Sequence, residues 1–263
     1  MKMSFPGLQG VKFQGGLVKY LILIFSFLVI GCANLKIIGE SDQNTEVYVG
    51  IKNGNIIYRG EITETSNNVI FSLFNGAELK PSRLVITSNG GEIGAGMDLG
   101  RWVKDNKLDV EVKGACASSC ANYVFPAANT KYLRKDSILI WHGGAWQSNW
   151  RITEDNRESF NTYITLMRKM ETHFYADIGV DNLLTTYGQS KVSFWDYIQN
   201  FFGIGTVGYD YSLADLQKFG VANIELLDEE WDWRKYRPDR ANLVKRIKVD
   251  DDYKFGLNRF EIN

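Results

Sequence analysis

Histidine and cysteine are scarce in this chain of 263 residues, which has 2 histidines and 3 cysteines. So few nitrogen and sulfur ligands disfavour a zinc site, and the sequence predicts neither a metal nor another cofactor. If an imidazole serves as a general base, it is His142 or His173. The formal net charge of −1 is also small. Bulk charge therefore predicts neither a nucleic-acid partner nor attraction to an acidic surface.

The sequence also lacks an apolar run of the roughly 20 residues that a membrane-spanning helix needs. The shorter run Tyr20–Ile30 follows three lysines and leads into Gly31 and Cys32. This order is typical of a secretory signal, which we place over residues 1–32. The ending VIGC resembles the bacterial lipobox, which implies that Cys32 is lipidated and becomes the new N-terminus. An uncleaved anchor is the alternative, and both place the rest of the chain outside the cytoplasm.

Composition divides the residues after the signal. Residues 33–46 are polar and predict a tether, whereas residues 47–263 predict a single folded domain with a C-terminal extension. With 44% hydrophobic residues the chain can bury a full core. Ala33 stands where many inner-membrane lipoproteins carry an aspartate, which favours anchoring to the outer membrane on its periplasmic side.

Three short apolar runs each end in small or polar residues. Leu84–Ile86 leads into SNGG, Val110–Val112 leads into GACASSC, and Ile138–Trp141 leads into HGG. Helical patterns follow the first two runs. Strand, turn and helix in this repeated order predict an α/β domain with function at the ends of its strands.

Further elements are predicted around these runs. Asn53-Gly54 between two apolar runs predicts a β-hairpin over residues 47–62. Apolar spacing predicts helices over Thr65–Leu79, capped by Thr65 or Ser66, from Ile93 onward, and over Glu154–Ala176. Residues 243–249 fit either a strand or a short helix.

The three strand ends carry groups that suit acyl transfer. Gly90 and Gly91 can bring backbone N–H groups close to a ligand because glycine has no Cβ. Ser118 supplies a hydroxyl where a strand gives way to a helix, and His142 follows the next strand. A hydroxyl, an imidazole and convergent amides are the parts of a nucleophile, a general base and an oxyanion hole.

Four segments together resemble the superfamily of the Clp protease proteolytic subunit and crotonase. They are TSNGGEIGAGM, GACASSCANYVFPAA, SILIWHGG and YSLADLQKFGVA. The second segment is most similar to envelope proteins of the Clp type that carry a Cys-Ala-Ser-x-Cys turn. The resemblance covers about residues 80–225. It implies an α/β spiral of repeated β-β-α units, a serine peptidase activity and assembly into homo-oligomers.

The resemblance also implies roles for the serine turn. Its spacing from Gly114 points to Ser118 as the nucleophile. The N–H groups of Ser119 and of Gly90-Gly91 would then hold the oxyanion. Both serines could instead cap the helix that follows them.

His142 would be the base, and the alternative is an ordinary hydrogen-bonded histidine at a strand end. His173 falls on the helix 154–176 and fits a surface or packing role. A carboxylate would orient the imidazole, and the candidates are Asp196 and Asp210, of which Asp210 is preferred. A dyad, or a site that no longer cleaves, remains open.

Cys116 and Cys120 flank Ser118. Once Cys32 is lipidated they are the only thiols left, and an oxidising compartment favours a disulfide between such a pair. The bond would fix the serine turn, provided that the two Cα atoms lie within about 7 Å. The alternative is two buried, small apolar side chains.

A second resemblance is weaker. Gly90, Gly94 and Gly96, together with Tyr187 and Lys191, match the glycine and Tyr-x-x-x-Lys patterns of short-chain dehydrogenases. The glycine turn does not follow the first strand, however, and the Tyr–Lys pair comes too soon for the intervening units. Close packing of a helix on a strand also explains these glycines.

The sequence thus predicts a serine hydrolase of the bacterial envelope that acts on a peptide or protein substrate and is held to a membrane by a lipid. The first alternative is a catalytically inactive scaffold or binding protein with the same fold. The second is an acyl-CoA enzyme of the crotonase type, which an extracytoplasmic location disfavours because coenzyme A is cytoplasmic.

Overall fold

The short apolar runs form the strands of a mostly parallel sheet. The computed structural model describes residues 47–148, 150, 152–191 and 205–260. Its 7-stranded sheet has the order β1 (Tyr48–Lys52), β2 (Asn55–Arg59), β3 (Arg83–Ser88), β4 (Asp109–Ala117), β5 (Lys131–Leu133) and β8 (Ile224–Leu226), with β6 (Ile138–Ile140) beside β4. β1 and β2 pair antiparallel, and the other strands of this sheet pair parallel.

The predicted hairpin joins β1 to β2. Asn53 and Gly54 both have positive φ, 51° and 72°. This pair of left-handed residues is typical of a two-residue turn whose twist matches that of the flanking strands. The hairpin prediction is confirmed, although β2 ends at Arg59 rather than at Ile62.

Strand β4 changes its neighbour halfway along its length. Residues Val110–Val112 pair with β5, whereas Ala115–Ala117 pair with β6. Gly114 lies between these two parts with a φ of +85°, and the register against β3 shifts in the same stretch. A bulge of this kind re-aims the end of a strand. The C-terminal half of β4 therefore delivers Ser118 between β3 and β6.

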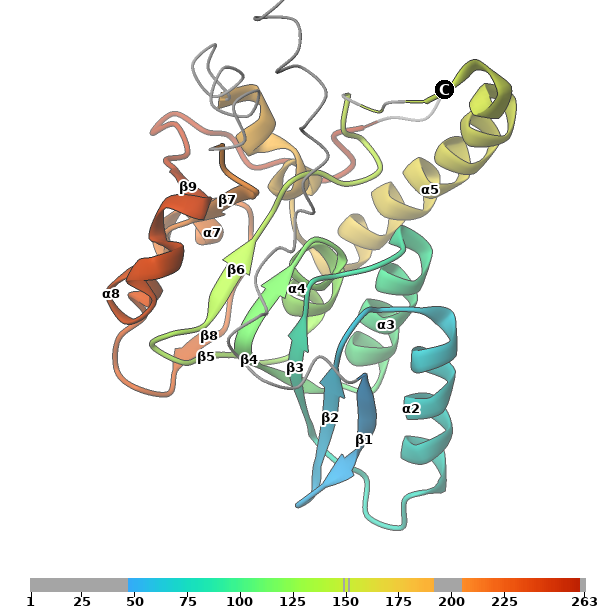
Figure 1. The fold of residues 1–263 in the computed structure, drawn as a ribbon, viewed down its shortest axis with the longest axis vertical. Helices are drawn as coiled ribbons and strands as arrows, with labels where there is room; N and C mark the ends of the chain where they lie inside the picture. The colour runs from blue at the N-terminus through green and yellow to red at the C-terminus, as the bar shows by residue number, and fades with distance from the viewer. Residues whose placement is uncertain (1–46, 149, 151, 192–204, 261–263) are drawn as a thin grey trace, which may run out of the picture. The chain divides into compact units, whose positions relative to one another are not determined.

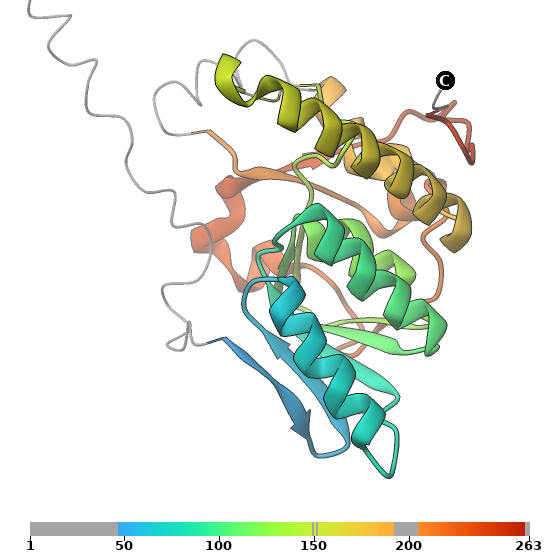
Figure 2. The ribbon, with the colours of Figure 1, turned by 90° about the vertical axis from the view of Figure 1, so that its right-hand side faces the viewer.

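Three longer helices lie on one face of the sheet: α2 (Glu64–Gly76), α3 (Ile93–Asp105) and α5 (Arg157–Ile178) (Figures 1 and 2). The prediction of Thr65 or Ser66 as the cap of α2 is wrong. Thr63 is the N-cap, and its side chain accepts a hydrogen bond of 3.1 Å from the Ser66 N–H. Glu64 already belongs to the first helical turn, so the capping residue must precede it.

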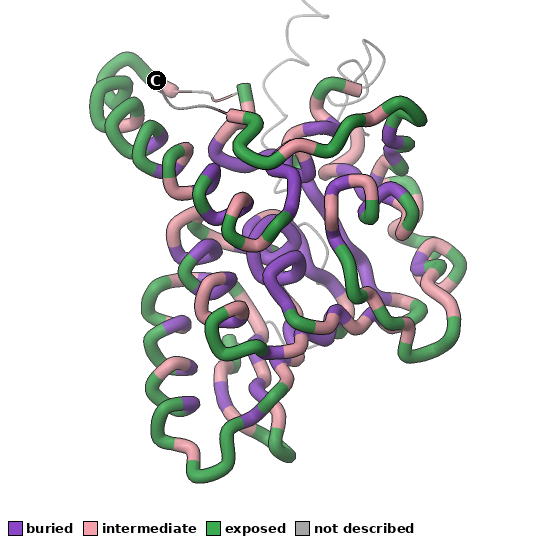
Figure 3. The backbone as a smooth tube through the Cα atoms, turned by 180° about the vertical axis from the view of Figure 1, so that it is seen from behind, coloured by how far each residue is buried: buried purple, intermediate pink, exposed green. Residues whose placement is uncertain are grey.

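A second, small layer covers the other side of β6. Strands β7 (Gly208–Tyr211) and β9 (Val244–Ile247) pair parallel, and α8 (Trp233–Tyr236) lies beside them (Figure 1). Trp233 and Val244 form a small apolar cluster with alternate residues of β4 and β6. The larger core lies under the long helices, and the buried residues of the central strands are concentrated there (Figure 3). Residues 243–249 thus supply a strand, not a helix.

The remaining described helices are short: η1 (Cys120–Val124), α4 (Phe125–Ala127), η2 (Glu154–Asn156), η3 (Asn182–Thr185), η4 (Tyr187–Lys191), α7 (Leu213–Lys218) and η5 (Pro238–Leu243). The architecture is of the α/β class, as predicted. No helix in the described part of the chain is long and apolar enough to cross a membrane. The signal segment with Cys32 and the tether 33–46 lie outside the described residues.

Candidate functional site

The glycine turn after β3 lies directly against the serine turn after β4. Gly90 has a φ of +95°, and a Cβ on it would fall 2.6 Å from the Ser118 Cβ and 2.8 Å from the Ser119 nitrogen. A Cβ on Gly91 would fall 2.0 Å from the Ile62 oxygen. Only glycine permits either approach. The two turns that the sequence analysis selected are therefore in contact.

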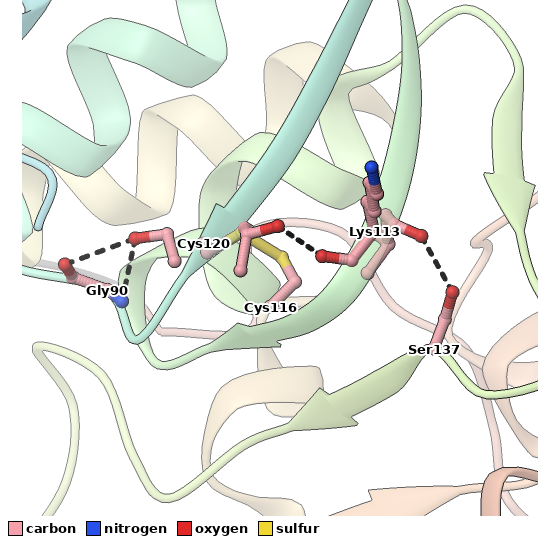
Figure 4. Close-up of a disulfide and its surroundings, with 8 residues drawn as sticks. Gly90, Lys113, Cys116, Cys120 and Ser137 are labelled. Carbon is pink, nitrogen blue, oxygen red and sulfur yellow. Dashed lines mark hydrogen bonds between the residues drawn. A yellow bond between two sulfur atoms is a disulfide. The ribbon is translucent and has the colours of Figure 1, made fainter. Parts of the chain in front are cut away.

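The backbone N–H groups of these turns differ in whether they already donate a hydrogen bond. The Gly90 N–H donates to Ser88 Oγ at 3.0 Å (Figure 4), which leaves it a poor candidate for an oxyanion. Gly91 N–H has no partner among the described residues. Ser119 N–H stands at the start of a helical turn, where helix geometry provides no acceptor. Gly91 and Ser119 are thus the better pair of donors, and Gly90 mainly allows the two turns to approach each other.

Ser118 adopts a left-handed backbone conformation, with a φ of 53°. For a residue with a Cβ this conformation costs roughly 1–2 kcal/mol. Its N–H donates to the Ile140 oxygen at 2.9 Å, and its carbonyl oxygen accepts from the Asn122 N–H at 2.8 Å. A serine held in this way between a strand and a helix has the geometry of a nucleophile elbow. Strained non-glycine residues of this kind concentrate at functional sites.

The structure separates Ser118 from Ser119. Ser119 is 2% exposed, and its hydroxyl donates to the Gly91 oxygen at 2.7 Å. Ser118 is partly exposed, and its hydroxyl has no hydrogen-bond partner in the described part of the chain. The hydroxyl of Ser119 is therefore committed to the contact between the turns, whereas that of Ser118 is free to react.

A disulfide closes the serine turn. Cys116 at the end of β4 and Cys120 at the start of η1 are bonded, with Cα atoms 5.2 Å apart (Figure 4). Both cysteines are fully buried. Of the two alternatives that the sequence left open, the structure contains the disulfide. Closing so short a loop stabilises the folded chain by about 2 kcal/mol and confines Ser118 within the covalent loop between the two cysteines.

His142 lies next to the serine turn along the sheet. Ala117 pairs with Ile140, so Ser118 is level with Trp141 and His142 is one residue further on. The residue is exposed, yet desolvation by the surrounding protein lowers the pKa of its imidazole below the usual value. It is therefore neutral at pH 7 and able to accept a proton. No hydrogen bond joins Ser118 to His142 within the described structure.

Asp210, the preferred carboxylate partner of the histidine, is already bound by other groups. Its carboxylate is fully buried and accepts hydrogen bonds from Arg234, Arg246 and the Trp233 indole. A Cβ on Gly208, which shares a face of β7 with Asp210, would lie 3.4 Å from the His142 Cβ, so it is the bonding of its oxygens to these three residues, not the face of the strand, that keeps Asp210 from the histidine. No described carboxylate bonds to His142. Asp196 lies outside the described residues.

The second resemblance gains no support from the geometry. Tyr187 accepts a hydrogen bond from the Asp250 N–H at 3.0 Å, and Lys191 forms an ion pair of 2.7 Å with the Asp250 carboxylate. Both residues therefore bind the C-terminal segment. Gly96 allows α3 to approach the serine turn, since a Cβ there would lie 2.7 Å from the Ser119 Cβ. Close packing explains this glycine.

Sequence analysis missed two polar residues behind the site, Asn122 and Glu171. Both are almost completely buried, at 2% and 0% exposure. Asn122 donates to the Gly143 oxygen and Glu171 accepts from the Ala145 N–H, so both hold the segment that follows His142. A signal existed for Glu171, because it occupies the apolar stripe of α5 between Met167 and Phe174.

The described residues include no cluster of three or more histidine, cysteine, aspartate or glutamate side chains that could hold a metal ion. Exposed His173 lies on α5, away from the serine turn in sequence and without a role in the contacts above. No protein-family model matches the chain, and no curated protein matches it either.

Proposed function

We propose that the chain is a serine hydrolase that cleaves peptide bonds in the bacterial envelope, and that its fold is a spiral of the type found in the Clp protease and crotonase superfamily. The observation that carries the proposal is the left-handed Ser118, closed in by a disulfide and packed between Gly90 and the strand that leads to His142. The strained backbone and the disulfide both act on Ser118, whose hydroxyl is the one at this turn that has no hydrogen-bond partner in the described part of the chain.

The residues divide the chemistry as follows. Ser118 Oγ forms a bond to the carbonyl carbon of the scissile peptide as its proton passes to His142. The N–H groups of Gly91 and Ser119 stabilise the negative charge on the oxygen. His142 then gives the proton to the leaving amine as the C–N bond breaks. Water, deprotonated by His142, next attacks the acyl group and releases both the acid and Ser118.

The separation of Ser118 and His142 is compatible with this sequence of steps. Catalytic hydrogen bonds are often long without substrate and shorten only when substrate binds. His142 is exposed and its pKa is lowered, so its ring is free to turn and unprotonated near neutral pH. No carboxylate of the described residues binds His142, so we propose a Ser–His dyad, or a triad completed by Asp196, which lies outside those residues.

Labelling with a fluorophosphonate probe tests this function, because such probes react with an activated serine. Wild type should label, whereas Ser118→Ala and His142→Ala should not. Ser159→Ala and His173→Ala are matched controls on the exposed surface and should label like wild type. Folded wild type that does not label would contradict the hydrolase.

That contrary result would favour the second candidate, a scaffold without turnover. The observation in its favour is that, among the described residues, no carboxylate binds His142 and no hydrogen bond joins it to Ser118. In that case Ser118→Ala should leave the cellular phenotype unchanged, whereas deletion of the gene should change it.

We further propose that lipidation of Cys32 anchors the protein at the periplasmic side of a membrane, the outer one in preference. The disulfide supports a location outside the cytoplasm, because thiols are kept reduced inside it. Metabolic labelling with a fatty-acid analogue should mark wild type and not Cys32→Ser. A homo-oligomer is expected from the family resemblance, and light scattering after size-exclusion chromatography measures its mass.

A further inference from the structure

Two buried side chains from different elements hold the three residues after His142. Asn122 Nδ2 donates to the Gly143 oxygen at 2.7 Å, and Glu171 Oε2 accepts from the Ala145 N–H at 2.7 Å. Gly144 lies between these two bonds, where a Cβ would fall 2.9 Å from Glu171 Oε2. The backbone that leaves the histidine is therefore fixed on both sides of one glycine.

Asn122 also touches the serine turn. Its backbone N–H donates to the Ser118 oxygen at 2.8 Å, while its side chain reaches Gly143. The Tyr175 hydroxyl donates to the Asn122 oxygen at 2.5 Å and fixes the residue from α5. One residue thus bridges the segments that carry the proposed nucleophile and the proposed base.

Glu171 is an unusual residue for a core. It is fully buried and forms no ion pair with a described residue; one of its carboxylate oxygens lies near the buried Asn182 amide but forms no hydrogen bond among the described residues. Its other oxygen accepts from both the Tyr123 hydroxyl, at 2.6 Å, and the Ala145 N–H. Nearby Arg168 instead donates to the Ala145 oxygen at 3.1 Å. Burial of an unpaired carboxylate is costly, so packing alone does not account for it.

We propose that Asn122 and Glu171 are positioning residues for the reaction, which fix the backbone of His142 relative to that of Ser118. The inference rests on the proposed function. Neither side chain touches the reacting atoms. Each acts through the segment Gly143–Ala145, and Asn122 acts through the Ser118 carbonyl as well.

The ionisation of Glu171 enters this arrangement. Burial raises the pKa of its carboxyl to about 7. The groups that face it are Tyr123 and Tyr175, whose pKa values burial also raises, Tyr209 next to Tyr175, and the cation Arg168. These tyrosines stay neutral, so Glu171 is the group of this cluster that titrates near neutrality. The ionised form accepts the Ala145 N–H more strongly.

The experiment measures the rate of fluorophosphonate labelling in full-length variants. Glu171→Met removes the acceptor at similar size, and Asn122→Ala removes the donor. Both should lower the rate by at least about tenfold, because small displacements of catalytic groups are that costly. Glu171→Gln keeps an acceptor oxygen and should retain most of the rate, but lose its pH dependence near 7. Equal losses in Glu171→Met and Glu171→Gln would overturn the role of the hydrogen bond.

Matched controls separate positioning from folding. Asn67 is also 2% exposed and donates to a backbone oxygen, that of Ala95, at 2.8 Å. Asn67→Ala should lose a similar amount of stability and leave labelling nearly unchanged. Glu111→Gln serves in the same way for a buried glutamate, since Glu111 pairs with arginines on the sheet. If the labelling rate fell in proportion to the melting temperature across all these variants, the proposal would be overturned.

A second measurement does not depend on activity. The chain has 2 histidines, so two imidazole signals appear in an NMR spectrum, and His173→Gln identifies them. Glu171→Met and Asn122→Ala should each shift the His142 signal and its pKa, while the two control variants should not. If wild type does not label, the hydrolase proposal fails but this result still decides the positioning. Unchanged His142 signals would overturn it.

Discussion

Two fully buried carboxylates lie on opposite sides of the strand that leads to His142, and their surroundings differ in every respect. Asp210 is bound by two arginines and an indole, which together satisfy both of its oxygens. Glu171 forms no ion pair with a described residue, because nearby Arg168 donates to the Ala145 oxygen instead, and one of its oxygens has no hydrogen-bond partner among the described residues. The charge of Asp210 is compensated, whereas that of Glu171 is held at a cost.

The largest effect is expected on the Asp210 side. Asp210→Ala removes the common partner of Arg234 and Arg246 and leaves both guanidinium groups beside a buried apolar cluster. The arginine side chains left behind are 25% and 44% exposed and become partly solvated, so the expected loss is that of the charge-assisted hydrogen bonds, each worth about 1.5–3 kcal/mol, which urea unfolding measures. The His142 NMR signal should keep its pKa. A shift of that pKa with little loss of stability would restore Asp210 as the partner of the histidine.

The next effect has the opposite sign. The folded protein holds the Glu171 proton up to a pKa of about 7, above the ordinary value of 4.5. Between these pH values the folded state binds more protons than the unfolded state, so wild type loses stability as the pH rises from 4.5 to 7. The loss is on the order of a few kcal/mol and is complete above pH 7.

Glu171→Gln removes this loss. Its free energy of unfolding should exceed that of wild type at pH 8, and the difference should vanish near pH 4. Urea unfolding across this range measures it, with Glu111→Gln as the control that shows no such gain. A wild-type stability that stays constant from pH 4.5 to 7 would mean that Glu171 is ionised throughout.

A smaller loss is expected from the disulfide. Replacing both Cys116 and Cys120 by alanine removes a short covalent loop and should lower stability by about 2 kcal/mol. The serine turn then loses its constraint, so fluorophosphonate labelling should fall more than this stability loss explains. Labelling at the wild-type rate would show that Gly90 and the helix hold Ser118 without the bond.

The smallest effect concerns the backbone of Ser118. Ser118→Gly relieves the left-handed conformation and should stabilise the fold by up to about 1 kcal/mol, while Ser118→Ala should leave stability nearly unchanged. Thermal unfolding of the two variants gives the difference. Equal melting temperatures would indicate that the turn is not strained.

The strands and turns around Ser118 could largely be predicted from the sequence, whereas the partners of the two buried carboxylates could not. The strands before Ser118 and His142, the Asn53-Gly54 hairpin and α3 follow from local apolar spacing and turn chemistry, and the structure has all of them. The contact between the Gly90 and Ser118 turns also follows, because neighbouring parallel strands end at the same edge. Local patterns carry this much of the fold and of the site.

The partners of the carboxylates could not be predicted in this way. Asp210 resembles a candidate partner for a histidine until Arg234 and Arg246 are known to meet it, and they lie 24 and 36 residues further along the chain. Glu171 was read as part of a regular helix, because periodicity does not show which polar residue points inward. The N-cap of α2 could not be assigned correctly from the sequence either, because Thr63, Thr65 and Ser66 are all chemically able to cap.

The placement of the Cys116–Cys120 bond also has a consequence for the order of assembly. The two residues are 4 apart in sequence, so their thiols meet without any distant contact, and the rate of bond formation depends on the oxidant rather than on chain collapse. The hydrogen bonds between Asp210 and Arg246 join residues 36 apart in the sequence, so they form only when the chain collapses. The covalent loop around Ser118 therefore depends on local chain contact and an oxidant, whereas the hydrogen bonds of Asp210 depend on the folded sheet.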